Sequence, residues 1–169
     1  AMGGVEASLR RFAHYDYWDE AVRPGIRVDA GADLLMFGMG ERTILVTADW
    51  MSRGAPVWEC AKMRGVCFLS PAAMRASIEI PSYEDCVRSK KKYGEAFLVQ
   101  YNEQDPIRGH AISQRHGDQY VVQTVPDMPL SREELDQSYT LPYQRTWHPD
   151  YDALGGVPAI EEVQFSIAH

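Results

Sequence analysis

Hydrophobic positions in the first third of the chain predict a helix, a buried strand and a second helix. A helix over residues 5–22 is predicted by apolar side chains at three- and four-residue spacing, namely Leu9, Phe12, Ala13 and Tyr17. Residues 32–37 are an almost continuous apolar run between two glycines, which is typical of a strand buried on both faces in a parallel sheet. Residues 41–53 predict a helix with Gly54 just beyond its end. A helix, a strand and a helix after a glycine corner make half of a doubly wound α/β unit.

The second half of the chain mixes short strands with helices, so the pattern changes near residue 65. Residues 66–69 and 77–80 predict two strands around a turn that contains proline. Residues 111–114 and 119–124 flank a turn and predict a hairpin, and residues 163–167 alternate as in a strand. The fold class expected from residues alone is therefore α/β, with a mixed α+β second half.

Two capping boxes predict helix starts in this half. Ser82 opens a helix that extends to about Asn102, and Ser131 opens a shorter one. Residues 141–158 are rich in proline, glycine and aromatic residues and predict irregular structure. The buried stripe expected on the first of these helices is Tyr83, Cys86, Val87, Tyr93, Phe97 and Tyr101.

Composition and charge narrow the function classes. The 169 residues carry a formal net charge of −7, which argues against a nucleic-acid partner because such proteins normally present a basic surface. No apolar run is long enough for a membrane span, and the first 25 residues contain no apolar signal-peptide core. Three cysteines without framework spacing, Cys60, Cys67 and Cys86, predict free thiols in a reducing cytoplasm.

Two glycine corners are the candidate ligand-binding residues. Gly38, Gly40 and Glu41 lie between a predicted buried strand and a helix, and Gly3 and Gly4 stand at the equivalent position before the first helix. Ligands of open α/β sheets bind beyond the carboxyl ends of strands, where helix amides favour anions. The corners predict a groove for a nucleotide-like group, or else two tight turns that need glycine for backbone reasons.

Other groups of residues in the sequence favour structural roles over catalytic or metal-binding ones. The aromatic residues between His14 and Trp18 are more typical of core or interface than of a cofactor site. His110 and His116 lie six residues apart without a third ligand nearby, so we predict no metal there. We predict no catalytic residue in this chain, because no nucleophile and base can be paired from spacing.

Several short sequence motifs occur in an order and spacing that match those of a known family. They are GGVEASLRR at 3–11, HYDYW at 14–18, FGMGER at 37–42, IPSYE at 80–84, QRHGD at 114–118, LSREELD at 130–136, LPY at 141–143 and HP at 148–149. This set of motifs closely resembles the amino-terminal region of the YgiQ-type radical SAM proteins, a family of uncharacterised function.

The resemblance implies a longer parent protein. Family members look like a domain similar to the cobalamin-binding domains of other radical SAM enzymes, followed by a radical SAM barrel. Residues 1–64 would be the carboxyl-side half of the first domain, and residues 65–169 a family-specific α+β region leading into the barrel. The barrel carries three cysteines spaced C-x3-C-x2-C, which hold a 4Fe-4S cluster with one iron open for S-adenosylmethionine.

The sequence departs from the whole enzyme in two respects. The strands expected before Gly3 are absent, and the cysteine motif, expected shortly after the segment matching residues 164–169, is absent as well. Cys60, Cys67 and Cys86 do not have its spacing. We therefore expect no cofactor in this chain, and we do not expect cobalamin because its ligand histidine would come from the missing half.

The resemblance implies an amino-terminal region of a radical SAM enzyme of unknown substrate. The region would be non-catalytic in isolation and would pack on the barrel of the same polypeptide, shaping access to its active site. The alternative is a non-catalytic binding or interaction module of α/β type. Because residues 34–37 would lose sheet neighbours, we also expect the isolated chain to self-associate as a consequence of truncation.

Overall fold

The computed structural model describes residues 1–144 and 146–162, which belong to two compact units, Ala1–Pro129 and a second that begins at Leu130. The strands are β1 (His14–Asp16), β2 (Ala21–Arg23), β3 (Leu35–Met36), β4 (Val66–Ser70), β5 (Ile78–Ile80), β6 (Ile112–His116) and β7 (Gln119–Gln123). The helices are α1 (Val5–Leu9), α2 (Ile26–Ala30), α3 (Glu41–Ser52), η1 (Val57–Lys62), α4 (Tyr83–Arg88), α5 (Lys90–Asn102), α6 (Arg132–Tyr139), η2 (Pro149–Leu154) and α7 (Pro158–Glu162), where η marks 3-10 helices. None of them has both the length and the apolar composition needed to cross a membrane.

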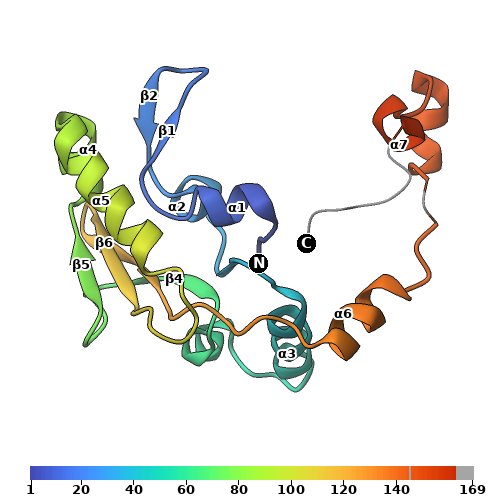
Figure 1. The fold of residues 1–169 in the computed structure, drawn as a ribbon, viewed down its shortest axis with the longest axis horizontal. Helices are drawn as coiled ribbons and strands as arrows, with labels where there is room; N and C mark the ends of the chain where they lie inside the picture. The colour runs from blue at the N-terminus through green and yellow to red at the C-terminus, as the bar shows by residue number, and fades with distance from the viewer. Residues whose placement is uncertain (145, 163–169) are drawn as a thin grey trace. The chain divides into compact units, whose positions relative to one another are not determined.

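A five-stranded sheet organises the first unit (Figure 1). Its order is β3-β4-β7-β6-β5; only β5 and β6 pair in parallel, and β6 and β7 form the predicted hairpin. The mixed α/β class is thus confirmed. The parallel surroundings predicted for residues 32–37 need correction: β4 pairs with β3 in the antiparallel sense, and a parallel bridge comes only from Met2 to Leu35. This sheet also joins residues on both sides of the domain boundary predicted at residue 64.

Strand alternation gives the sheet two buried faces. One face packs against α4 and α5, whose Cys86 and Ala96 are almost fully buried in the same cluster as Ile112 and Val121 (Figure 1). The other face packs Met36 and Val66 against η1, around a smaller core. The short strand β3 contributes to both cores because its side chains alternate across the sheet.

The amino-terminal helix predicted over residues 5–22 is wrong beyond Leu9. Residues 14–23 instead form the hairpin β1–β2, in which Tyr15 pairs with Val22, and Figure 1 shows it projecting beyond α1 and α2. The reason lies at the preceding residues: Phe12 is fully buried, and the Ala13 N–H donates to the Gln114 side chain at 2.8 Å. These contacts with a distant strand hold the chain away from helical geometry.

The helix predicted over residues 83–102 is interrupted at Ser89. The backbone of Ser89 is extended, at φ −143° and ψ 113°, and its hydroxyl caps α5 by accepting from the Lys92 N–H. The break changes which side chains face the sheet, so the predicted stripe is only partly correct. Cys86 is buried, Tyr83 and Tyr93 are half-buried, and Val87, Phe97 and Tyr101 are exposed.

The other predicted elements divide into confirmed and undescribed ones. The helix predicted over residues 41–53 is α3, and the capping boxes at Ser82 and Ser131 are both present. The predicted strands at 66–69 and 77–80 are β4 and β5, which each pair with the β6–β7 hairpin. Residues 141–158, predicted irregular, include η2. The strand predicted over residues 163–167 lies outside the described residues.

Buried polar side chains fasten the amino-terminal segment to the sheet. Arg11 is 7% exposed; its Nε donates to Gln123, and its guanidinium lies 5.1 Å from the centroid of the Phe37 ring. Gln114 is fully buried and accepts from Ala13 while donating to the Pro81 carbonyl at 2.8 Å. The buried polar residues Gln114 and Gln123 therefore serve packing rather than solvent contact.

Candidate binding site

The two predicted glycine corners lie side by side. Met2 runs alongside β3, with its N–H bonded to the Leu34 carbonyl at 2.9 Å and its carbonyl bonded to the Met36 N–H at 2.8 Å. The chain then turns at Gly3 and Gly4, next to the turn at Gly38, whose N–H donates to Ser8 Oγ at 3.1 Å. The structure thus brings both corners to the carboxyl end of β3.

Backbone geometry accounts for the glycines at two of these positions. Gly4 and Gly38 have φ of 93° and 70°, a region that side chains with a Cβ rarely adopt. Gly40 is the N-cap of α3 and Glu41 its first residue, whereas α1 has only five residues and offers a weak dipole. A ligand at these glycines and Glu41 stays a prediction.

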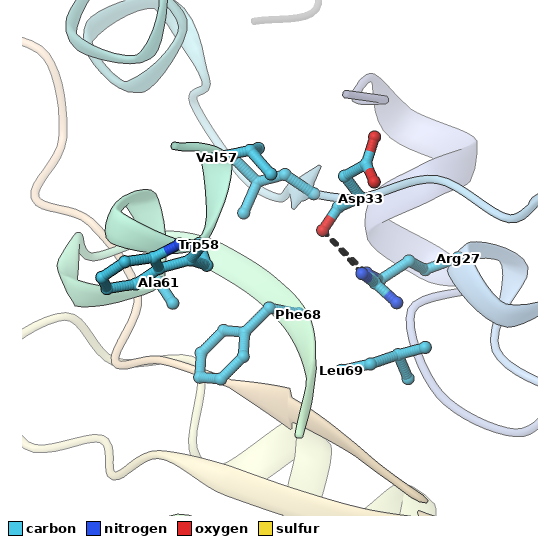
Figure 2. Close-up of a pocket in the computed structure, with 8 residues that line it drawn as sticks. Arg27, Asp33, Val57, Trp58, Ala61, Phe68 and Leu69 are labelled. Carbon is cyan, nitrogen blue, oxygen red and sulfur yellow. Dashed lines mark hydrogen bonds between the residues drawn. The ribbon is translucent and has the colours of Figure 1, made fainter. Parts of the chain in front are cut away.

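A partly open pocket of about 150 Å³ lies at the other end of β3, in the first unit (Figure 2). It forms where β4 continues past the start of β3 and η1 and α2 close over the gap. The residues lining it are Arg27, Asp33, Leu34, Val57, Trp58, Ala61, Phe68 and Leu69. They come from four segments between residues 27 and 69, namely α2, the residues just before β3, η1 and β4.

Arg27 supplies the cation of this pocket. The left-handed Gly31 ends α2, and the chain turns so that the Asp33 carbonyl accepts from Arg27 Nε at 3.2 Å and from Nη2 at 2.6 Å. Nη1 has no hydrogen-bond partner among the described residues. Burial lowers the pKa of Arg27, with the nearby Asp33 charge acting in the opposite direction, yet a guanidinium stays protonated in proteins.

The remaining walls are apolar and partly aromatic. Phe68 from β4 and Trp58 from η1 lie across the pocket from Arg27, and Figure 2 shows the Asp33 carboxylate directed away from both rings. Trp58 is 64% exposed, and Lys62 Nζ lies 5.8 Å from its ring centroid. The arrangement is an apolar pocket with one fixed positive group in its wall.

The cysteines do not fit an iron–sulfur cluster. Cys60, Cys67 and Cys86 are free and buried in different elements, and they divide between the two cores of the first unit. Burial raises the pKa of Cys67 to about 12 and that of Cys86 to about 11, so both are thiols in the folded chain. The described residues also contain no group of three or more metal-ligating side chains.

Comparison with known proteins gives the family. A family model described as Radical SAM N-terminal matches residues 1–166. The chain belongs to this Radical SAM N-terminal family. The chain is also 50% identical to a UPF0313 protein of Clostridium botulinum (strain ATCC 19397 / Type A) over 168 residues, and 50% identical to a UPF0313 protein of Clostridium perfringens (strain SM101 / Type A) over 169 residues.

These alignments cover 98% of this chain but 26% of each relative, so the chain spans about a quarter of the length of the curated relatives that it matches. No solved structure matches the chain. The resemblance to the amino-terminal region of YgiQ-type radical SAM proteins is confirmed. The chain therefore corresponds to an amino-terminal part of a larger polypeptide.

The Arg27 pocket was not predicted from the sequence. The two corners were predictable because glycines after apolar runs are a local signal. By contrast, Arg27 and Asp33 form part of a pocket only when α2 folds onto β4, which places them near Trp58 and Phe68. A lone arginine inside a short helix between two glycines was the available signal, and it is a weak one.

Proposed function

We propose that this chain is the non-catalytic amino-terminal region of a radical SAM enzyme. In the whole protein it packs on the radical SAM barrel and shapes access to the 4Fe-4S cluster and S-adenosylmethionine. The observation that carries the proposal is the family match over residues 1–166, in a chain that spans 26% of its relatives. The cluster chemistry belongs to the remainder, because the three cysteines here do not fit a cluster.

The β1–β2 hairpin is the segment best suited to contact the rest of the polypeptide. Trp18 is 78% exposed and Tyr17 is 66% exposed, and their ring centroids lie 5.0 Å apart. Tyr15, on the same hairpin, is 51% exposed. Exposed aromatic groups of this kind are typical of surfaces that become buried on association.

Hydrogen exchange tests the proposal on the intact gene product and on residues 1–169 in parallel. Packing on the barrel should slow amide exchange in residues 14–23 at least tenfold in the intact protein. Trp18→Ser should return that exchange to the rate of the isolated chain. Ile107→Ser, which replaces a residue that is 79% exposed in a loop, serves as the matched control and should have no effect. Equal exchange in both proteins would contradict the packing.

The alternative, a non-catalytic interaction module, is distinguished by the parent gene. A C-x3-C-x2-C motif encoded shortly after residue 169 supports the enzyme, since this spacing is a specific cluster signal. Its absence supports the module. Cobalamin is not part of the proposal.

A further inference from the structure

Only some of the N–H groups of the Arg27 guanidinium are hydrogen-bonded within the part of the protein that the structure describes. Its Nε and Nη2 hold one backbone oxygen, the Asp33 carbonyl, while the edge formed by Nη1 and Nη2 keeps free donors. Arg27 is 7% exposed, so this edge has little water around it except through the pocket. An acceptor placed in the pocket would replace water at these donors, and a hydrogen bond to a charged group is stronger than one between two neutral groups.

The free edge selects the chemistry of the acceptor. Two parallel N–H groups of a guanidinium match the two oxygens of a carboxylate, which is a stronger and more directional pairing than a neutral acceptor makes. Arg27 is the one cation among the lining residues, and Asp33 is an acid beside it. One positive group next to a carboxylate favours a monoanion over a phosphate with two charges.

The walls and the volume select the rest of the ligand. Val57, Ala61, Leu34 and the rings of Trp58 and Phe68 are apolar, so the group behind the carboxylate must be apolar too. The volume of about 150 Å³ is that of a cavity that holds one benzene ring. Lys62 lies beside Trp58 at the surface and adds positive potential at the approach.

We propose that this pocket binds a small monocarboxylate that carries one aromatic ring or a branched apolar group of similar size. Arg27 holds the carboxylate through its Nη1–Nη2 edge, and the ring lies between Trp58 and Phe68. The site is independent of the predicted glycine corners, which lie at the opposite end of β3, and of the cluster chemistry assigned to the remainder of the protein.

Benzoate and benzamide are matched probes, because they have nearly the same shape and differ in charge. Each is titrated into residues 1–169 while NMR follows the Trp58 indole and the backbone amides of residues 57–61 and 68–69. Benzoate should give saturable shifts with a dissociation constant in the millimolar range, typical of so small a ligand. Benzamide should bind at least tenfold more weakly. Equal binding of the two probes would overturn the role of Arg27.

Three variants localise the effect. Arg27→Lys keeps the positive charge but removes the two parallel N–H groups of the guanidinium. It should weaken benzoate binding at least tenfold. Trp58→Leu should weaken both probes severalfold, and because Trp58 is largely exposed the variant should fold. Trp18→Leu makes the same change on the hairpin, away from the pocket, and should leave benzoate binding by residues 1–169 unchanged. A folded Arg27→Lys variant with unchanged benzoate affinity refutes the proposal.

The intact gene product supplies the last comparison. Benzoate should bind it as it binds residues 1–169. Loss of binding in the intact protein would mean that a side chain of the remaining polypeptide fills the pocket, which would overturn a small-molecule site. This result is separate from the hairpin experiment, since a packed hairpin is compatible with either outcome here.

Discussion

Protonation of His116 should destabilise the first unit. The imidazole lies on the buried face of β6, stacked on Tyr83 with ring centroids 5.4 Å apart and planes 2° apart. Its Nε2 is 3.0 Å from Oε1 of Gln114, an acceptor, so Nε2 carries the proton. Nδ1 is buried and has no partner in the described residues, so a second proton there would have nothing to bond to.

The size of the effect follows from the pKa. Burial lowers the pKa of His116 from 6.5 to about 4, while the neighbouring Glu84 charge acts in the opposite direction. Above pH 6.5 the folded and unfolded chains both hold a neutral ring. As the pH falls from 6.5 toward 4, only the unfolded chain gains the proton, so stability is lost. Between pH 7 and pH 5 the loss is about 2 kcal/mol from this residue alone.

Urea unfolding of the chain and of His116→Gln, followed by circular dichroism at pH 7, 6 and 5, isolates this contribution. Glutamine can still donate to Gln114 but cannot titrate, so its stability curve should be flatter. The variant should be less stable at pH 7, because it loses the stack on Tyr83. The stability gap between the two proteins should shrink by about 2 kcal/mol by pH 5. Parallel curves would refute the buried neutral histidine.

Three further predictions test the packing. Gly25→Ala should destabilise the chain by about 1–3 kcal/mol in thermal or urea unfolding, because its Cβ would lie 2.6 Å from the Arg11 carbonyl oxygen; an unchanged midpoint would contradict that contact. Ser82→Ala removes the side chain of a capping box and should cost about 1 kcal/mol in the same assay, against no change if the cap is unformed. Cys67 and Cys86 should resist alkylation at pH 8 in the folded chain and react fully in denaturant, as mass spectrometry would show; rapid reaction of the folded chain would disagree with their raised pKa values.

The elements that were predictable from the sequence are those set by local interactions. The capping boxes at Ser82 and Ser131 depend on residues three apart, and both form as predicted. The interruption at Ser89 had a local signal as well, since a serine before Lys90 can cap a new helix, but the apolar spacing continued through it. Periodicity alone therefore overstated the length of that helix.

The elements that were not predictable are set by distant residues. The spacing of Leu9, Phe12 and Tyr17 fits a helix, but Ala13 is bound by Gln114 across the fold and the chain becomes a hairpin. Within that hairpin the Asp16 side chain accepts from the Trp18 N–H at 3.0 Å and stabilises the turn. The Arg27 pocket is non-local in the same way, because its walls meet only after the sheet has formed.

We propose that this chain is a non-catalytic region of a cluster-binding enzyme. Iron and sulfide analysis after reconstitution, carried out in parallel on residues 1–169 and on the intact gene product, tests it most directly. The intact protein should hold about four irons per polypeptide, with thiolate-to-iron absorbance, and residues 1–169 should hold no stoichiometric iron. A stoichiometric cluster in residues 1–169, or none in the intact protein, would contradict it.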